Sequence, residues 1–467
     1  MRDGKAGKAK NPNHRRFRRW ILHSPARFSI LAFVVLIGAG TVLLALPAAS
    51  TGKSVGLINA LFTATSASCV TGLAVVDTGK AFTLFGQGVI LLLIQAGGLG
   101  IMTLSTLFLL LAGRRTSLVG RLVIKDALTD GKERSLPALL KDVLLFTMVI
   151  EGMGAFLLFI RFLPGRGVLD ALYLGLFHSI SAFCNAGFAI FSDSFVRYRE
   201  DWMVNLVICM LIISGGLGFL VLSELRRKRP FHRRSWTRLS LHSKVVLSTT
   251  GILLAGGTLL IFFMEWNDTL QGFSLPGRVL AAFFQSVTAR TAGFNTLPIG
   301  AMANETLFLL VVLMFIGASP GSCGGGIKTT SFASLTALGV GRLLGKNKPQ
   351  LFRRTIADES MGRAISIVMV SVTVVVVATM SLLVSELGNV SHALTRGRFF
   401  ELFFEVVSAF GTVGLSTGIT AGLSQAGKVI ITLVMFIGRL GPLVIAVAVS
   451  RDTAPRYYYA EESMMIG

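Results

Sequence analysis

Long apolar runs separated by short polar stretches are the main pattern of this 467-residue chain. The run from Phe28 to Leu46 contains no charged residue, and neither do the runs 89–112 and 365–384. About 20 apolar residues cross a hydrocarbon layer of roughly 30 Å as an α-helix. The pattern therefore predicts eight membrane-spanning helices, near residues 28–47, 87–112, 141–163, 203–223, 244–264, 306–339, 364–385 and 429–450.

Four short segments between these spans repeat one pattern of residues. Each has a phenylalanine ten residues before a glycine, and Leu or Phe follows the glycine. The half-helices that lead to the glycines, such as 57–67 and 172–183, cross only about one-third to one-half of a bilayer. We therefore predict an all-α polytopic membrane protein of four parallel M1–P–M2 repeats, with eight transmembrane helices and four re-entrant pore helices around a central pore. The glycines are Gly72, Gly187, Gly293 and Gly414.

The irregular backbone at these glycines points to a cation pore. In lipid, unpaired peptide groups cost several kcal/mol, so such segments must be buried or line water. Four of them around one axis would offer backbone carbonyls in place of a cation's water shell, without the carboxylates that Ca²⁺ or Mg²⁺ prefer. For one isolated glycine, tight helix packing would be the simpler explanation. The predicted filter residues are Val70, Thr71, Gly72, Asn185, Ala186, Gly187, Thr291, Ala292, Gly293, Thr412, Val413 and Gly414.

The second predicted span of each unit also contains a glycine-rich sequence. Units one, two and four have GGLG or GRLG at 97–100, 215–218 and 438–441, and unit three has the longer sequence 317–326. Arg439 lies inside the eighth predicted span, where an unpartnered charge costs about 2.5–3.5 kcal/mol. We expect it to contact the loop 317–326 and to form a constriction with it; an arginine that only stabilises the fold is the alternative. The predicted gate residues are Gly317, Gly321, Gly324, Gly325, Gly326 and Arg439.

Composition and charge agree with a membrane protein. Hydrophobic residues make up 52% of the chain and charged residues 15%, which leaves too little polar surface for a soluble fold. The net charge of +22 arises from basic residues that gather at the N-terminus and in every second connection. By the positive-inside rule we expect these segments and both termini to be cytoplasmic. We therefore expect a membrane lipid environment and no nucleic-acid partner, and we expect the first apolar run to be a retained helix rather than a signal peptide.

The remaining candidate chemistry favours no enzyme and no metal centre. The four cysteines have no CxxC spacing, the sequence contains no P-loop or HExxH motif, and we expect no nucleophile elbow. We expect His178 and Glu405 to orient pore helices, and Glu151 and Glu265 to need no special function. Arg290 either complements the end of its pore helix or repels ions at the outer mouth.

The motifs resemble those of the Ktr/Trk/HKT superfamily of potassium transporters, from about residue 28 to 450. The residues that carry the resemblance are Val70-Thr71-Gly72-Leu73, Cys184-Asn185-Ala186-Gly187-Phe188, Arg290-Thr291-Ala292-Gly293-Phe294 and Thr412-Val413-Gly414. In that superfamily, glycine at all four positions goes with potassium selectivity, whereas serine at the first favours sodium. The resemblance also implies that 317–326 is an intramembrane gating loop and that Arg439 is its arginine. Unit three departs from the pattern, with Val287-Thr288 where the other units have Ser-Ala.

With only eight predicted spans, the chain resembles the bacterial Ktr membrane subunit more than the longer Trk subunit. This resemblance implies potassium as the transported ion and sodium as a driver or modulator. It further implies a homodimer with one pore in each protomer, seated on a separate cytosolic ring of nucleotide-binding regulatory subunits of the RCK type. An alternating-access secondary cation transporter is the main alternative, and a lipid-modifying enzyme and a membrane scaffold are others.

The predicted organisation follows from the spans and the basic connections. The repeats are 28–112, 141–223, 244–345 with the loop 317–326, and 364–450. Cytoplasmic segments are expected at 1–27, 113–140, 224–243, 346–363 and 451–467.

Overall fold

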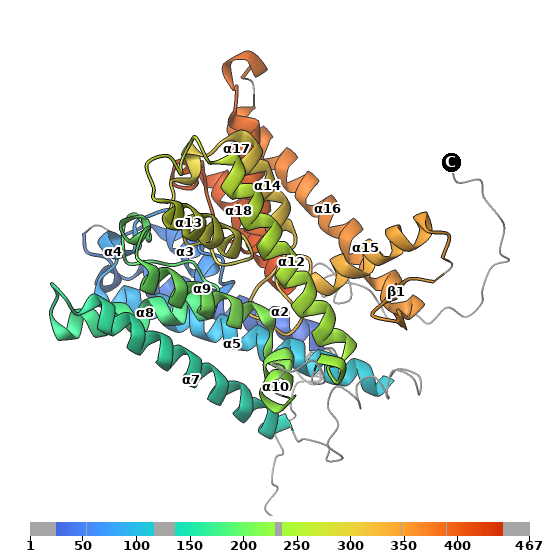
Figure 1. The fold of residues 1–467 in the computed structure, drawn as a ribbon. Coiled ribbons are helices and arrows are strands. Elements are labelled where there is room, and N and C mark those ends of the chain that lie inside the picture. The colour runs from blue at the N-terminus through green and yellow to red at the C-terminus, as the bar shows by residue number, and fades with distance from the viewer. Residues whose placement is uncertain are drawn as a thin grey trace, which may run out of the picture.

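The computed structural model describes residues 25–52, 54–115, 136–228, 236–346, 348–388 and 390–441. This part of the chain is mostly helical, as predicted (Figure 1). Its only sheet is a hairpin of the two-residue strands β1 (Gln350–Leu351) and β2 (Arg354–Thr355).

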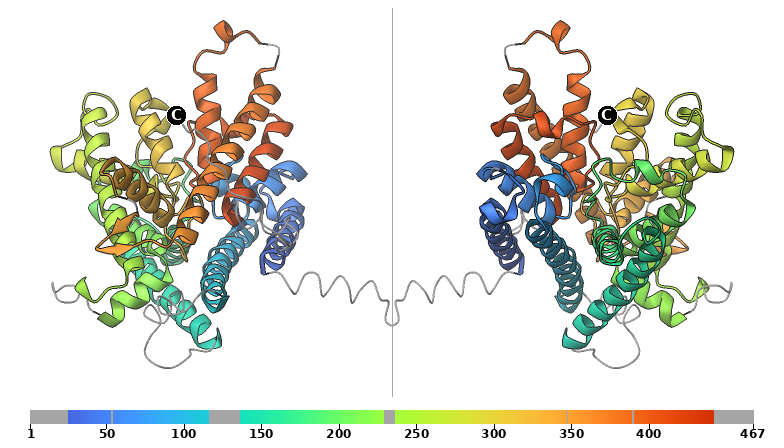
Figure 2. Two further views of the ribbon diagram at one scale, coloured as in Figure 1. Left: turned by 90° about the vertical axis from the view of Figure 1, so that its right-hand side faces the viewer. Right: turned by 90° about the vertical axis from the view of Figure 1, so that its left-hand side faces the viewer.

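Long helices form the frame of the fold (Figures 1 and 2). Four of them, α2, α7, α12 and α16, are long and apolar enough to cross a membrane, and the described residues contain a fifth candidate span if α9 and α10 are counted together. The total of eight spans therefore stays a prediction, and part of the last predicted span, 442–450, lies outside the described residues. The long helices are α2 (Pro25–Ala45), α5 (Leu84–Arg115), α7 (Leu136–Phe162), α12 (Leu241–Met264) and α16 (Asp358–Leu387).

Shorter helices fill the space between the long ones. In four places a buried helix of 12 to 16 residues follows a long helix and ends just before one of the four glycines. These four helices, called pore helices from here on, are α3 (Leu57–Ser68), α8 (Val168–Phe183), α13 (Leu275–Thr288) and α17 (Arg398–Gly411). The others are α4 (Thr78–Ala81), α9 (Trp202–Leu217), α10 (Phe219–Lys228), α14 (Asn304–Phe315), α15 (Thr329–Leu343) and α18 (Gln425–Leu440), with 3-10 turns at 47–49, 196–198, 299–301, 392–394 and 420–422.

The pore helices pack in a closed order. Helix α5 contacts α8, α9 contacts α13, α14 contacts α17, and α18 contacts α3, so that the last part of the chain lies against the first. Three of the four repeat phenylalanines, Phe62, Phe177 and Phe404, are fully buried in this packing, and Phe283 is half-buried. The sequence pattern thus marks the inner faces of the pore helices.

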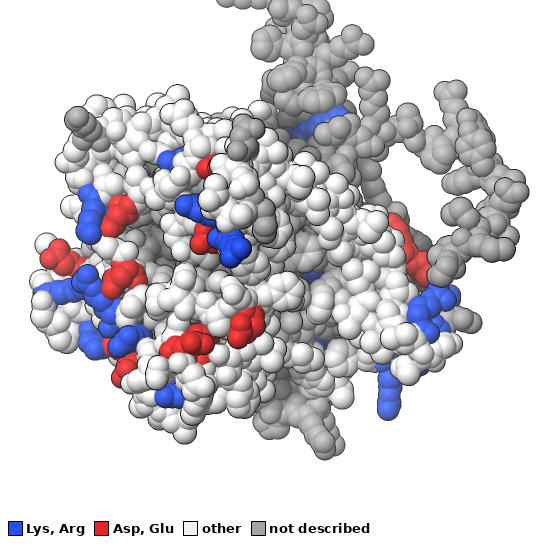
Figure 3. All heavy atoms as spheres, turned by 90° about the horizontal axis from the view of Figure 1, so that it is seen from above, with Lys and Arg blue, Asp and Glu red and all other residues white. Residues whose placement is uncertain are grey.

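The outer surfaces of the long helices are apolar. Val372, Val376 and Met380 of α16, and Met148 and Phe156 of α7, are all more than two-fifths exposed. Wide areas of the face in Figure 3 have neither acidic nor basic side chains. Such surfaces fit contact with lipid.

The predicted span 203–223 is sharply bent rather than straight. Helix α9 ends at Leu217, Gly218 has φ +86°, and α10 continues at an angle of 101° to α9. By contrast, the span 306–339 is interrupted between Phe315 and Thr329, around the expected loop 317–326. Only glycine adopts such a φ without steric cost, which places the sharp bend at this residue.

Glu265 joins the end of α12 to the start of α14, a role that the sequence analysis did not assign to it. Its fully buried carboxylate accepts hydrogen bonds from the Thr269 hydroxyl at 2.6 Å and from the Thr269 and Ala303 backbone N–H groups at 3.2 and 3.0 Å. Ala303 immediately precedes α14, so this carboxylate satisfies an N–H at the helix start.

We predict that Glu265→Ala lowers the free energy of unfolding by about 1–3 kcal/mol, because buried donors would lose their acceptor. Glu305→Ala is the matched control, since Glu305 lies in the first turn of α14 but is exposed. Thermal unfolding of both variants in detergent micelles measures the difference, and equal midpoints would contradict this role of Glu265.

Candidate ion pathway

The four glycines that follow the pore helices meet at one place. They follow one another around the ring in the order of the four units, with the glycine of unit four next to that of unit one. A Cβ atom on any of them would overlap the carbonyl oxygen of the residue just before the next glycine in this order. In the first two contacts the distance would be 2.6 Å, which no real side chain allows. The four pairs close a ring of backbone, which we call the glycine ring: Gly72 with Ala186, Gly187 with Ala292, Gly293 with Val413, and Gly414 with Thr71.

The backbone of the glycine ring has the same unusual conformation in all four segments. Each glycine has a positive φ, and so does the residue two positions before it. Alternation of this kind turns successive N–H groups to one side, so the carbonyls face the other. Three of the preceding residues are β-branched, and a positive φ costs a residue of that kind about 1–3 kcal/mol. Their φ values are +55° at Val70, +59° at Asn185, +73° at Thr291 and +49° at Thr412.

Hydroxyl groups of the pore helices hold the strained segments. Ser66 and Ser181 donate to the carbonyl of the residue after the glycine at 2.8 and 2.7 Å, and Ser408 accepts from the N–H of Gly414 at 3.1 Å. In unit three, Thr288 donates to the corresponding carbonyl of Phe294 at 2.6 Å. The hydroxyl there lies one residue later in the sequence, which explains how unit three tolerates its departure from the Ser-Ala pattern.

Two further side chains connect pore helices to the segments that follow the ring. The imidazole of His178 donates from Nδ1 to the Leu174 carbonyl at 2.8 Å and accepts from the Ile190 N–H at Nε2, at 3.3 Å. The carboxylate of Glu405 accepts from the hydroxyls of Ser416 at 2.8 Å and Thr420 at 2.5 Å. These contacts fit the orienting role expected for both residues.

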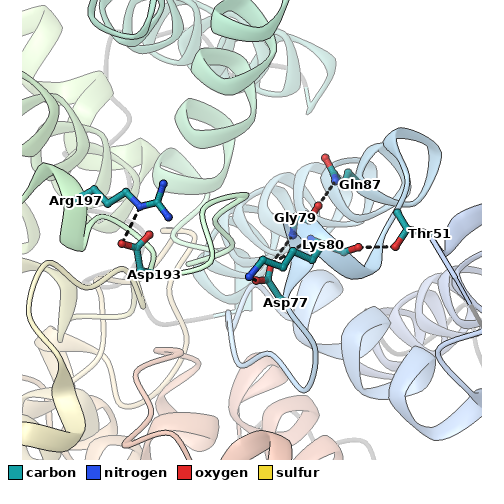
Figure 4. A network of polar contacts seen from close by, with 7 residues as sticks. All are labelled: Thr51, Asp77, Gly79, Lys80, Gln87, Asp193 and Arg197. Carbon is teal, nitrogen blue, oxygen red and sulfur yellow. Dashed lines mark hydrogen bonds and ion pairs between the residues drawn. The ribbon is translucent and has the colours of Figure 1, made fainter. Parts of the chain in front are cut away.

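A cavity of about 300 Å³ lies on one side of the glycine ring and is lined by all four glycines. Asp77 and Asp193 also line it, and each forms an ion pair with a basic side chain (Figure 4). Lys80 Nζ lies 3.6 Å from Asp77, and Arg197 Nε lies 3.2 Å from Asp193. Neither carboxylate was predicted to lie beside the ring; their position five or six residues after a ring glycine was the available signal.

On the opposite side, the segment 316–328 lies directly against the ring. The N–H of Gly325 donates to the Thr412 hydroxyl at 3.0 Å, and Gly324 lies so close to the Thr291 hydroxyl that a Cβ would strike it. The Thr291 hydroxyl also lies 3.1 Å from the side-chain amide of Asn185. Three of the four side chains that precede the ring glycines thus meet the loop or each other.

Three basic side chains hold carbonyls of this loop. Arg439 is buried and donates to the carbonyl of Cys323 and, at 2.6 Å, to that of Gly97. Arg290 is also buried and donates to the Gly317 carbonyl at 3.4 Å, which fits its predicted place at the end of its pore helix and not the alternative place at the outer mouth. Lys328 Nζ donates to the Gly324 carbonyl at 2.6 Å. Sequence reasoning found the contact of Arg439 but overlooked Lys328, although a lysine that ends a glycine-rich apolar stretch was visible.

Comparisons with known proteins give the family. The family described as "Cation transport protein" (TrkH) matches residues 16–455. The "Ktr system potassium uptake protein B" of Bacillus subtilis is 39% identical over 451 residues, which cover 96% of this chain and 98% of that protein. The "Potassium/sodium uptake protein NtpJ" of Enterococcus hirae is 38% identical over 449 residues, 95% of this chain and 97% of that protein.

A solved structure agrees with the fold. The potassium transporter TrkH from Vibrio parahaemolyticus matches with a TM-score of 0.72 and 18% identity, over 90% of this chain and 83% of that one. The apolar helices and the family together define a multi-pass membrane protein. The chain belongs to the TrkH family of cation transport proteins, which confirms the resemblance noted in the sequence.

We predict that Thr288→Val lowers cation flux into vesicles and also lowers stability by about 1–3 kcal/mol, because the buried Phe294 carbonyl loses its donor. Thr288→Ser keeps the hydroxyl and should retain most of the flux. A loss of flux in both variants would instead assign the effect to side-chain volume.

Proposed function

We propose that this protein conducts potassium into the cell through a channel-like pore whose filter is the glycine ring. The observation that carries the proposal is the closed contact order of the four glycines, which brings four strained, carbonyl-bearing segments together. The names of the two relatives reported above support potassium as the ion.

The chemistry of the ring suits a large monovalent cation. The twelve predicted filter residues include no carboxylate, so their oxygens belong to backbone carbonyls and to the neutral side chains of Thr71, Asn185, Thr291 and Thr412. Each pore helix ends just before the ring, where its negative dipole end favours a cation. Neutral carbonyl dipoles replace a weakly held water shell more readily than the tight shell of a divalent ion.

The loop 317–326 acts as the gate in this proposal. It contacts the inner end of the ring through Gly325. The positively charged side chains of Arg439 and Lys328 donate hydrogen bonds to its carbonyls. Positive charge beneath a cation filter raises the barrier to passage, and movement of the loop lowers it.

The wider assembly follows the resemblance and the names of the relatives. We infer four M1–P–M2 repeats at 28–112, 141–223, 244–345 and 364–450, with both termini in the cytoplasm of a bacterium. We also infer a homodimer, sodium as a modulator, and a separate cytosolic regulatory subunit that binds a nucleotide. The name "Ktr system potassium uptake protein B" of one relative supports a system of more than one component.

We predict that the chain restores growth at low potassium in a host that lacks its own uptake systems, and that Gly72→Ser lowers the ratio of potassium to sodium flux. A Cβ on Gly72 would lie 2.6 Å from the Ala186 carbonyl, so the ring must shift there. If the shifted ring disfavours potassium relative to sodium by about 1.4 kcal/mol, the ratio of potassium to sodium flux falls about tenfold.

Gly56→Ser is the matched control for this selectivity test. Gly56 also has a positive φ, +82°, but no atom lies within 4 Å of its Cβ position. Tracer uptake of both ions into vesicles measures the ratio. An unchanged ratio in Gly72→Ser would place the filter elsewhere.

We predict that Arg439→Ala raises potassium flux above that of the wild type. If loss of the Arg439 contacts lowers the barrier to ion passage by about 1.4 kcal/mol, the flux rises about tenfold. The substitution removes the donor to Cys323 and a positive charge beside the loop. Lys428→Ala, which removes a charge from the same helix at its contact with Asn59, should leave flux near the wild-type level. Unchanged flux in a normally folded Arg439→Ala protein would remove the gating role.

A further inference from the structure

The bend between α9 and α10 is bonded to the loop 317–326 by backbone hydrogen bonds in both directions. The N–H groups of Ser319 and Cys323 donate to the carbonyls of Gly216 and Gly215, at 3.1 and 3.2 Å. In return, the N–H of Phe219, the first residue of α10, donates to the Gly321 carbonyl at 3.1 Å. The loop is therefore attached to unit two as well as to its own unit.

These bonds make the bend and the loop depend on each other. A broken helix leaves carbonyl and N–H groups without partners, and such groups are not tolerated inside a membrane unless the protein supplies replacements. The same sequence, GGLG, stays helical at 97–100 within α5, but it ends a helix at 215–218. The glycines permit the bend, and the loop supplies the partners that stabilise it.

The other end of α10 is fixed as well. Glu224 accepts from the N–H of Ser240 at 2.9 Å and from the hydroxyls of Ser240 and Ser243 at 2.7 and 2.5 Å. These two serines belong to the start of α12, where Ser240 is the capping residue. We call these three bonds the Glu224 clasp.

Two side chains of α10 also contact a single ring of α7. The ring of Phe219 packs edge-on against Phe146 of α7, with 5.8 Å between centroids, and Arg226 lies over the same Phe146 ring at 5.3 Å. A displacement of the Glu224 end therefore moves a short, stiff helix rather than a flexible linker.

We propose that α10 is a positioning lever for the gate: the Glu224 clasp sets its resting position, and the hydrogen bonds at Gly218 transmit its movement to the loop 317–326. This inference rests on the proposed gating role of the loop. It assigns Glu224, Ser243 and Gly218 as positioning residues, and it places the input to the gate at the contact between α10 and the start of α12.

Cys323 provides a direct report on the loop. Its thiol is fully buried in the loop, so its rate of modification measures how often the loop leaves its place. The full chain with Cys69, Cys184 and Cys209 replaced by serine keeps this thiol alone, and the background must first be shown to take up potassium. Methyl methanethiosulfonate added to reconstituted vesicles is the probe, and intact-protein mass gives the rate.

We predict that Glu224→Gln raises the rate of Cys323 modification about tenfold, within the range of about 5- to 150-fold typical of coupling between sites. Ser243→Ala removes one bond of the clasp and should give a smaller increase; it covers the case in which Glu224→Gln does not fold. Gly218→Ala should also raise the rate, since its Cβ would lie 2.8 Å from the Pro320 carbonyl. Gly272→Ala is the matched control, with φ +87° in open space, and should match the background.

Wild-type rates in both clasp variants, with an increase in Gly218→Ala alone, would overturn the lever, because the loop would then sense only the bend. Wild-type rates in all variants would overturn it too. Potassium flux measured on the same vesicles separates the two proposals. Faster modification without a change in flux supports the lever and contradicts the gating role of the loop.

Discussion

Peptide groups that cannot be left unpaired in lipid are the constraint on which this structure depends. The chain leaves helical geometry inside the fold at the glycine ring, at the loop 317–326 and at the bend after Leu217. At each place some of the partners come from another unit or from a side chain of a pore helix. The bend and the loop supply hydrogen bonds to each other, and this is why segments far apart in sequence depend on each other.

The two irregular regions along the pathway are held in different ways. The glycine ring is fixed by hydroxyls one turn or less from the ends of the pore helices, and by glycines so close that no side chain fits between them. The loop is held by long basic side chains and by a few backbone bonds to a bent helix. Short, stiff supports suit the proposed filter, whose geometry must persist, whereas long flexible side chains can follow the proposed movement of the loop.

Much of this arrangement could be read from the sequence because it repeats. The shared register of phenylalanine and glycine located all four ring segments, and the cost of a charge in lipid pointed Arg439 at the loop. The bend at Gly218 was missed because GGLG reads the same at 97–100, where the helix continues. The two copies differ in structure because the second forms backbone hydrogen bonds with the loop 317–326, which lies about 100 residues later in the chain and is not part of any local pattern. The contact of Lys328 with Gly324, only four residues away, was overlooked although it was visible in the sequence, whereas the choice between the two roles of Arg290 needed the path of the loop 317–326.

The glycine ring is assembled from four different stretches of a single chain. In a ring of identical subunits, one codon change alters every quadrant at once. Here it alters one, so each quadrant can diverge separately; Val70 already presents only methyl groups where the other three units place a polar side chain. In the pore proposed above, the preference among ions can therefore change one quadrant at a time, which gives a gradual evolutionary route between transport specificities.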